Sequence, residues 1–188
     1  NSGISPIYEP GLDELITKNY KAKRLFFTTD LKIAVNSSDI IFICVGTPNK
    51  KGSLNVDLSY VYKSIKEIAS VTKKKKIIVT KSTVPIGTGD EIEKILRKRK
   101  NFSIISNPEF LREGEAIRDF RYPDRIVIGS NNKKNFKTMK ELYAPLINKG
   151  AKFFTTSRRG AELIKYASNA FLATKITFIN ELANLCEK

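Results

Sequence analysis

Four short apolar runs, each bounded by turn-forming or charged residues, constrain the fold of this chain most. They are DIIFICV (39–45), KIIVT (76–80), FSIIS (102–106) and RIVIG (125–129). Runs this short and this continuously apolar are typical of strands buried on both faces of a sheet. Helical patterns lie between most of them, as at 57–71, where Val61, Ile65 and Ile68 share one face. Strand and helix alternating in this way predict an α/β fold with a doubly wound parallel sheet.

The remaining elements follow from the same patterns. Further strands are expected at 24–29 (RLFFTT) and 152–156 (KFFTT), and further helices at 11–20, 30–38, 90–98 and 137–146. Asp30 has the character of a helix N-cap. From Arg158 onward the chain contains no proline and no glycine except Gly160, which predicts one long helix. Because this helix is apolar around much of its circumference, we expect it to be buried.

The composition excludes several classes of protein and site. Hydrophobic residues make up 41% of the chain, which supports a packed core, and no apolar run has the length that crossing a bilayer requires. The sequence contains no histidine, so histidine triads and histidine-ligated metals are excluded and no metal site is predicted. Cys44 and Cys186 stand outside any metal-type cluster. We expect both to be small buried hydrophobic residues in a reduced, cytoplasmic protein.

The formal net charge of +15 raises the alternative of a nucleic-acid-binding protein. The densest basic clusters, 73–76 (KKKK) and 97–100 (RKRK), each stand where a helical pattern gives way to a strand. Cations are favourable at helix C-termini, and such turns are solvated. No aromatic residues alternate with these clusters, as a single-strand binding platform requires. A surface role is therefore favoured for them, and an anionic small ligand remains compatible with the charge.

Three loops follow predicted strands and are candidates for the functional site. Ligands of open α/β sheets bind beyond the carboxyl ends of the strands, which selects 45–49 (VGTPN), 81–87 (KSTVPIG) and 107–114 (NPEFLREG). In the second loop, Gly87 and Gly89 precede a helix whose N-terminus attracts anions. An ordinary strand-to-helix turn with hydroxyl caps is the simpler interpretation of that loop taken alone.

Two pairs of polar side chains stand out in these regions. Glu109 and Glu113 are four residues apart, so one helical turn would place both carboxylates on one face. An exposed surface pair is an equally good interpretation. Lys165 and Asn169 share a face of the long helix. A buried ammonium there could stabilise a developing oxyanion, and a lysine that reaches solvent is the alternative.

Five longer segments stand out when they are taken in order: IYEPGLDEL, DIIFICVGTP, KSTVPIGT, NPEFLREGEAIRDFRYPDRIVIG and ELIKYASNAFLATKITFINELANLCE. In this order and at this approximate spacing they resemble the UDP-glucose/GDP-mannose dehydrogenase family. The resemblance covers nearly the whole chain, and within the family it is strongest to the members that act on UDP-glucose. It implies NAD as cofactor, UDP-glucose as substrate, and oxidation of the sugar C6 alcohol through the aldehyde to the acid. GDP-mannose and UDP-N-acetylmannosamine are the alternative substrates.

The resemblance also assigns roles to individual residues. It implies contacts with NAD from Val45, Gly46, Thr47, Pro48, Asn49, Ser82, Thr83, Val84 and Glu113. It implies contacts with the sugar nucleotide from Glu109, Phe110, Leu111, Arg112, Glu113, Lys165 and Asn169. The catalytic residues that it implies are Thr83, Glu109, Glu113, Lys165 and Asn169. Thr83 would help to hold a water, and Glu109 would be the base for hydrolysis. Glu113 would lie between the cofactor and the reacting carbon, and Lys165 and Asn169 would stabilise the oxyanions.

Two parts of the family pattern do not occur in this sequence. They are the Gly-x-Gly-x-x-Gly fingerprint and the nucleophilic cysteine in a glycine-rich segment; Cys186 matches a non-catalytic position. We therefore expect an internal fragment, with an NAD-binding domain at 1–156 that lacks its first strands. Residues 157–188 would start a central helical domain through which the full-length protein forms a homodimer. Such a chain is expected to expose an apolar strand edge and to be inactive alone. A non-catalytic module that binds a nucleotide or dimerises is the alternative from another class.

Overall fold

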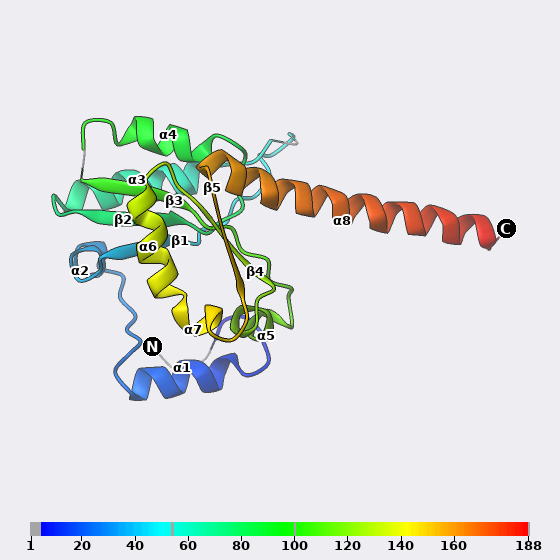
Figure 1. The fold of residues 1–188 in the computed structure, drawn as a ribbon, viewed down its shortest axis with the longest axis horizontal. Helices are drawn as coiled ribbons and strands as arrows, with labels where there is room; N and C mark the ends of the chain where they lie inside the picture. The colour runs from blue at the N-terminus through cyan, green and yellow to red at the C-terminus, as the bar shows by residue number, and fades with distance from the viewer. Residues whose placement is uncertain (1–4, 54, 100, 188) are drawn as a thin grey trace.

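The computed structural model describes residues 5–53, 55–99 and 101–187. Lys100 and Lys188, which belong to a predicted basic cluster and to the predicted long helix, lie outside the described residues. Along the chain the elements are α1 (Leu12–Lys21), α2 (Leu31–Asn36), β1 (Ile40–Ile43), α3 (Ser59–Val71), β2 (Lys76–Thr80), α4 (Thr88–Ile95), β3 (Phe102–Ser106), α5 (Ala116–Arg121), β4 (Arg125–Gly129), α6 (Lys133–Leu142), α7 (Ala144–Ile147), β5 (Lys152–Thr156) and α8 (Arg158–Cys186). The predicted α/β class is confirmed, and α8 projects from the body of the molecule (Figure 1).

The five strands form one sheet in the order β1-β2-β3-β4-β5. β1, β2 and β3 are parallel neighbours, and so are β4 and β5. β3 and β4 meet in antiparallel orientation, with Ser106 opposite Gly129, so the expectation of an entirely parallel sheet is wrong at this one place. The connection explains the difference. A parallel return needs a crossover on a face of the sheet, whereas α5 packs on the loop that follows β3 through an Arg112–Asp119 ion pair.

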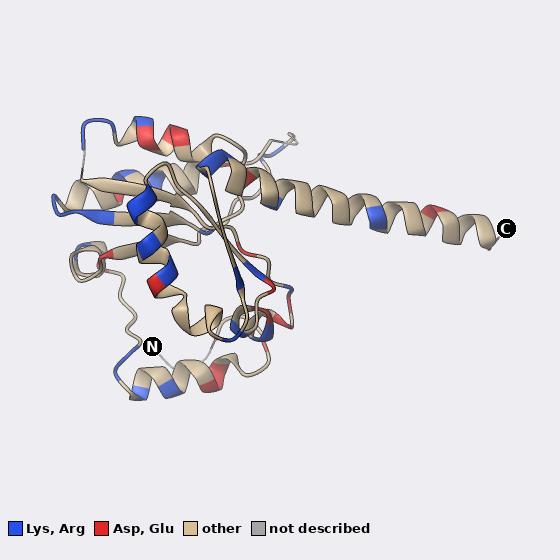
Figure 2. Ribbon diagram, in the orientation of Figure 1, with Lys and Arg blue, Asp and Glu red and all other residues tan. Residues whose placement is uncertain are grey.

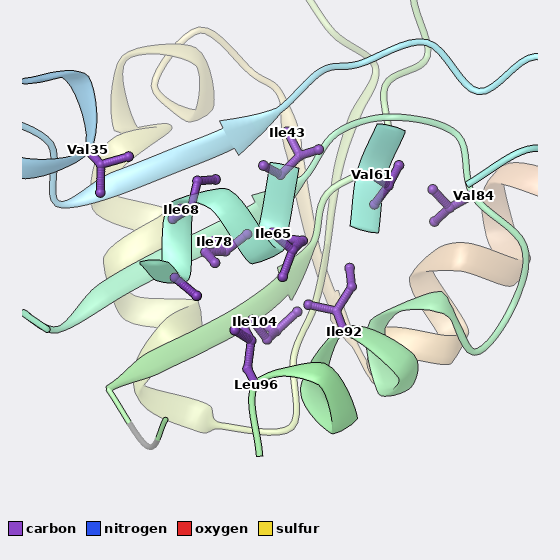
Figure 3. Close-up of a cluster of buried hydrophobic side chains, with 11 residues drawn as sticks. Val35, Ile43, Val61, Ile65, Ile68, Ile78, Val84, Ile92, Leu96 and Ile104 are labelled. Atoms are coloured by element: carbon purple, nitrogen blue, oxygen red, sulfur yellow. The ribbon is translucent and has the colours of Figure 1, made fainter. Parts of the chain in front are cut away.

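Apolar side chains cover both faces of the sheet. Neighbouring residues of a strand point to opposite faces, so Ile78 and Ile104 join one cluster while Val79 and Ile105 join the other. α3 and α4 contribute to the first cluster (Figure 3), and α6 and α7 contribute to the second. The first cluster consists of Val35, Ile43, Val61, Ile65, Ile68, Ala69, Ile78, Val84, Ile92, Leu96 and Ile104. Two covered faces explain why the strands are continuous apolar runs in the sequence.

Helix starts follow the local sequence. The Asp30 carboxylate accepts a hydrogen bond from Ile33 N at 3.0 Å, which confirms it as the N-cap of α2. In the same way the Ser157 hydroxyl accepts from Gly160 N at 3.0 Å at the start of α8. A side-chain oxygen in this position satisfies one of the N–H groups that the first turn of a helix leaves without a partner.

The prediction of a strand at 24–29 is wrong. These residues form no strand, and Phe26 and Phe27 are 74% and 53% exposed. A strand needs a hydrogen-bonded neighbour, and among the described residues neither the five strands of the sheet nor the isolated Asn49–Val56 bridge pairs with this segment. The exposed apolar edge predicted for the β1 run is confirmed, since β1 is one of the two edge strands and Phe42 is exposed.

The helix predicted at 137–146 is two helices in the structure. α6 begins earlier, at Lys133, where the Asn132 side chain accepts from Lys134 N, and α7 carries Pro145 in its first turn. Proline has no N–H to bond to the preceding turn, so one continuous helix does not pass through it.

α8 is one helix of 29 residues, as predicted, but the expectation that it is buried is wrong. Only side chains of its first turns are buried, and its far part projects away from the sheet (Figure 1). The exposed apolar residues there are Phe171, Leu172, Ile176, Phe178, Ile179, Leu182 and Leu185. Cys186 at its end is exposed, and so is Cys44, so the expectation of two buried cysteines is also wrong. Within the described part of the chain, no helix is both long and apolar enough to cross a membrane.

The close contact of α8 with β4 provides a test of the fold. A Cβ on Gly129 would lie 2.6 Å from Ala161 Cβ and 2.7 Å from Ser157 O, so an alanine there has to displace backbone. We expect Gly129→Ala to lower the free energy of unfolding by about 1–3 kcal/mol, measured by urea unfolding with circular dichroism.

Gly46→Ala is the matched control, because a Cβ there meets no atom within 4 Å. Its unfolding midpoint is expected to equal that of the parent. Equal stability of the two variants would contradict the packing of α8 on β4.

Candidate active site

The carboxyl ends of three strands meet under the first turns of α8. Thr80 of β2 lies opposite Ser106 of β3, and Ser106 lies opposite Gly129 of β4. α8 rests on this row because Gly129 has no side chain, which lets Ala161 approach the strand. The loops that follow β2 and β3, two of the three selected from the sequence, therefore start beside the same helix.

The loops after β1 and β2 are joined by hydrogen bonds. The Ser82 hydroxyl donates to Val45 O at 2.7 Å, and the Thr47 hydroxyl donates to Thr83 O at 2.9 Å. These are four of the residues expected to contact the cofactor, and the structure brings them side by side. Their roles remain predictions, but their proximity fits one shared site.

The other residues of that expected set have different surroundings. Gly46 is exposed, with open space where a side chain would be, and Val84 is buried in the first core cluster. Pro48 O accepts from Asp57 N at 2.7 Å, and Asn49 forms an isolated bridge with Val56. Open space against the backbone at Gly46 suits the close approach of a flat ring. Val84 instead anchors the loop after β2 to the first core cluster.

An ion pair joins α8 to the loop after β3. Lys165 Nζ donates to Glu109 Oε1 at 3.2 Å, while Glu109 Oε2 accepts from Leu111 N at 2.7 Å. The Lys165 side chain is 10% exposed and that of Glu109 is 31% exposed. The Phe110 ring lies beside the pair, with Arg125 at 4.3 Å and Lys165 at 5.3 Å from its centroid. This cluster places a carboxylate and an ammonium together at the strand ends.

Glu113 and Asn169 are not part of this cluster. Residues 107–115 are not helical, so Glu109 and Glu113 do not share the face of a helical turn, and Glu113 is exposed. Asn169 lies one turn beyond Lys165 on α8 and is also exposed. Both residues remain predicted site members.

Glu9 explains why the segment around Glu113 is not helical. Its carboxylate accepts from Gly114 N at 3.0 Å and from Ala116 N at 2.8 Å, so it caps α5 from outside. Gly114 has a φ of 80°, a left-handed conformation that interrupts a helix. The carboxylate therefore fixes the start of α5 beyond the two glutamates.

A cavity of about 630 Å³ lies beneath the loop after β3. Its lining residues are Lys81, Asn107, Pro108, Glu109, Phe110, Leu111, Arg112, Arg118, Asp119, Phe120, Tyr122, Pro123, Asp124, Arg125, Ile126, Tyr143 and Leu146. Arg112 binds Asp119 through Nε at 3.0 Å and Nη2 at 2.7 Å, and these hydrogen bonds lower the pKa of Asp119 to about 2. The pair fixes one wall of the cavity, and Glu109 and Lys81 lie on the wall nearest the strand ends.

Lys81 is a site residue that the sequence analysis did not single out. It follows β2 directly, and burial lowers its pKa from 10.5 to about 8, although the charges of Glu109 and Cys44 favour the ammonium. The Lys165 charge lowers the pKa further. A lysine at the end of a buried strand, beside two hydroxyl residues, is the sequence signal that could have identified it.

Glu162 is the second residue missed. The N-terminus of α4 was expected to attract an external anion, but the Glu162 carboxylate lies there, accepting from Gly87 N at 2.7 Å and Gly89 N at 2.8 Å. It also accepts from the Ser106 hydroxyl at 3.4 Å. Burial raises its pKa, and these hydrogen bonds act in the opposite direction. The anion that this helix terminus prefers is thus supplied by the chain itself.

Two family models match the sequence. The NAD binding domain of the UDP-glucose/GDP-mannose dehydrogenase family matches residues 1–147, and the central domain of that family matches residues 159–188. The chain belongs to the UDP-glucose/GDP-mannose dehydrogenase family. The resemblance found in the sequence is therefore confirmed, and the body of the structure is the NAD-binding domain of this family.

Individual relatives agree with this family assignment. UDP-glucose 6-dehydrogenase of Rhizobium meliloti (strain 1021) is 55% identical over 192 residues, covering 99% of this chain and 44% of the relative. The structure of a UDP-glucose dehydrogenase from Pyrobaculum islandicum matches with a TM-score of 0.89 and 38% identity, over 96% of this chain and 43% of that one. A ternary complex of GDP-mannose dehydrogenase from Pseudomonas aeruginosa matches with a TM-score of 0.88 and 39% identity, over 95% and 42%. The chain spans less than half the length of these family members.

The ion pair between α8 and the loop after β3 can be tested by a double-mutant cycle. Glu109→Gln and Lys165→Met each leave a partly buried charge without its partner, so each is expected to destabilise the fold by about 1–3 kcal/mol. The double variant should lose less than the sum, with a coupling of about 0.5–3 kcal/mol. Urea unfolding of the four proteins measures this, and additive losses would contradict the pair.

The environment of Lys81 predicts its titration. In protein with isotopically labelled lysine, the ε-methylene resonance of Lys81 is expected to titrate near pH 8, well below the ordinary 10.5. Because the fold favours the neutral amine, the contribution of Lys81 to the free energy of unfolding should increase as the pH rises from about 8 to 10.5. Loss of the resonance in Lys81→Arg assigns it, and a midpoint above 10 would contradict burial of the amine.

Proposed function

We propose that the protein containing this chain is an NAD-dependent UDP-glucose 6-dehydrogenase, which oxidises UDP-glucose in two steps to UDP-glucuronate. The observation that carries this proposal is the Lys165–Glu109 pair at the meeting strand ends, within a chain 55% identical to a UDP-glucose 6-dehydrogenase. Residues 1–156 would be the NAD-binding domain, and residues 157–188 the start of the central domain.

The chain's own residues suit the binding of the cofactor. The loops after β1 and β2 lie side by side, and open space at Gly46 lets a flat ring approach the backbone. NAD, when bound, supplies the hydride acceptor. Val45, Thr47 and Ser82 would hold it at the strand ends, and Thr83 would help to position the water used in the second step.

The chemistry of the sugar would fall to the ion pair. Lys165 would donate hydrogen bonds to the alkoxide and to the tetrahedral oxyanion. An ammonium stabilises such negative charge more strongly in a partly buried site than in water. Glu109 would accept a proton from the attacking water. Glu113, which is exposed, would contact both the cofactor and the sugar nucleotide. Asn169, which is also exposed, would contact the sugar nucleotide. Because both oxygens of Glu109 are already hydrogen-bonded, its carboxylate is held in one orientation.

The cysteine chemistry implied for the family does not fall to Cys186. This residue is 21 positions beyond Lys165 on one continuous helix, which corresponds to about 30 Å at 1.5 Å per residue. Cys44 lies nearer to the site, within electrostatic range of Lys81, but burial raises the pKa of its thiol, and it follows β1 among the predicted cofactor contacts. The nucleophile would therefore come from another part of the full-length protein.

The exposed apolar face of α8 supports assembly as a homodimer in the full-length protein. A helix that leaves Phe171, Ile176 and Phe178 exposed needs a partner surface to bury them. We propose a cytoplasmic location, which suits two free cysteines. A relative that oxidises GDP-mannose has a similar TM-score, so GDP-mannose is the main alternative substrate, followed by UDP-N-acetylmannosamine.

The activity test uses the full-length protein that contains this chain. With UDP-glucose and NAD⁺, we expect two NADH per UDP-glucuronate, and Glu109→Gln is expected to lower kcat by about 10²–10⁴-fold. The control is Glu67→Gln, which removes an exposed carboxylate that pairs with Lys63 on α3, and should leave kcat unchanged.

Three outcomes would change the assignment. Faster oxidation of GDP-mannose or UDP-N-acetylmannosamine would replace the substrate. Absence of NADH with all three sugar nucleotides would favour the non-catalytic module. Turnover of UDP-glucose by the 188-residue chain alone would contradict the proposal that the chain is inactive by itself.

A further inference from the structure

One turn of α8 holds two different loops of the site. Glu162 lies three residues before Lys165, so the two side chains lie within one turn on the same face of the helix. Lys165 binds Glu109 in the loop after β3. Glu162 binds the amide of Gly87, at the end of the loop between β2 and α4, and the amide of Gly89 in the first turn of α4. The position of one loop relative to the other is therefore set through a single rigid turn.

The loop held by Glu162 is the one that carries Thr83. It is fixed at its start, where Thr83 O accepts from the Thr47 hydroxyl, and in the middle, where Val84 is buried. At its end, Gly87 has a φ of 92°, and a Cβ on Gly89 would meet Glu162 Oε1 at 3.1 Å. Both glycines thus allow the backbone to present its N–H groups to one carboxylate. Without Glu162 the end of the loop would lose the hydrogen bonds that tie it to α8.

We propose that Glu162 is a positioning residue of the active site, which holds Thr83 in register with the Lys165–Glu109 pair through the amides of Gly87 and Gly89. This inference rests on the proposed function, because the register matters only if Thr83, Lys165 and Glu109 serve one reaction. Displacing a catalytic group by about 1 Å can reduce a rate about 10²-fold.

The chemistry at this position requires a carboxylate. Glu162 is 3% exposed, and its two oxygens accept from separate N–H donors, with the Ser106 hydroxyl as a third donor. Glutamine has the same shape, but its side-chain NH₂ would face one of these N–H donors and could not accept from it. A Glu162→Gln variant would therefore release one of the two amides while the helix stays seated.

A second link between α8 and α4 serves as the control. If Glu162 only held the two helices together, removing this second link would have the same effect on kcat as removing Glu162. Asp90, in the first turn of α4, accepts from Arg158 Nη2 at 2.8 Å and from Arg159 Nε at 2.6 Å. Arg158 also pairs with Glu93. These contacts join the same two helices but leave the amides of Gly87 and Gly89 untouched. Removing them should affect stability without moving Thr83.

The experiment compares Glu162→Gln, Glu162→Asp and Asp90→Asn in the full-length protein. For each variant, kcat and KM for UDP-glucose, the melting temperature, and hydrogen exchange of the Gly87 and Gly89 amides are measured. We expect Glu162→Gln to lower kcat by about 10- to 100-fold, with KM changed by less than about 3-fold, and to accelerate exchange at one or both amides. Glu162→Asp, which keeps the charge, should show an intermediate kcat. Asp90→Asn should lower the melting temperature and leave kcat and exchange at the parent values.

Several results would overturn the inference. A kcat for Glu162→Gln within about 2-fold of the parent, with faster amide exchange, would show that the loop position does not matter to the reaction. An equal loss of kcat in Asp90→Asn would reduce Glu162 to one structural link among others. If Glu162→Gln does not fold, Glu162→Asp decides. A parent-like kcat in this variant, together with faster exchange of the Gly87 and Gly89 amides, would refute the positioning role.

Failure of the proposed function is recognised separately. A parent protein that oxidises no sugar nucleotide removes the proposed function and, with it, the reaction that Glu162 would serve. In that case unchanged exchange at Gly87 and Gly89 in Glu162→Gln would additionally refute the amide contacts themselves. An active parent with an unaffected Glu162→Gln variant refutes only the positioning role.

Discussion

The contact between Gly129 and the first turns of α8 is the constraint on which the candidate site depends. The missing side chain lets Ala161 and the backbone of Arg158 approach β4 within a distance that any Cβ would prevent. Once α8 lies there, Glu162 reaches the loop after β2 and Lys165 reaches the loop after β3. A helix seated farther from β4 would draw both side chains away from these loops. The geometry of the charged groups is thus a consequence of close backbone packing.

Three buried charged residues on α8 make this position specific. Arg158, Glu162 and Lys165 are all nearly inaccessible, and burying a charge without a partner costs several kcal/mol. Arg158 pairs with Asp90 of α4, and Lys165 pairs with Glu109. Glu162 accepts from Gly87 N in the loop before α4 and from Gly89 N in the first turn of α4. A rotation of α8 that satisfied one of them would leave the others unpaired. Such a set of partners defines a single orientation of the helix more strictly than apolar contacts do.

The chain exposes large apolar side chains in two places. The far part of α8 carries few charges (Figure 2) and exposes a row of large apolar side chains. β1 forms one edge of the sheet. Phe26 and Phe27, in the segment that precedes α2, are also exposed. Apolar patches of this kind are rare on isolated soluble domains. They agree with a chain that spans less than half the length of the family members it matches.

The sequence by itself determined the α/β class, the strands at 76–80, 102–106, 125–129 and 152–156, the long helix, and the family, because these depend on local periodicity and on motifs in order. It also selected the strand-end loops that contain Glu109 and Thr83. Only the tertiary structure decided that the 24–29 segment is no strand, that β3 and β4 are antiparallel, and that α8 is largely exposed. It alone revealed Lys81 and Glu162. These properties depend on which neighbour is present to pair with a strand, cover a helix or bury a charge, and contacts between residues as distant as Gly87 and Glu162 leave no periodic trace in the sequence.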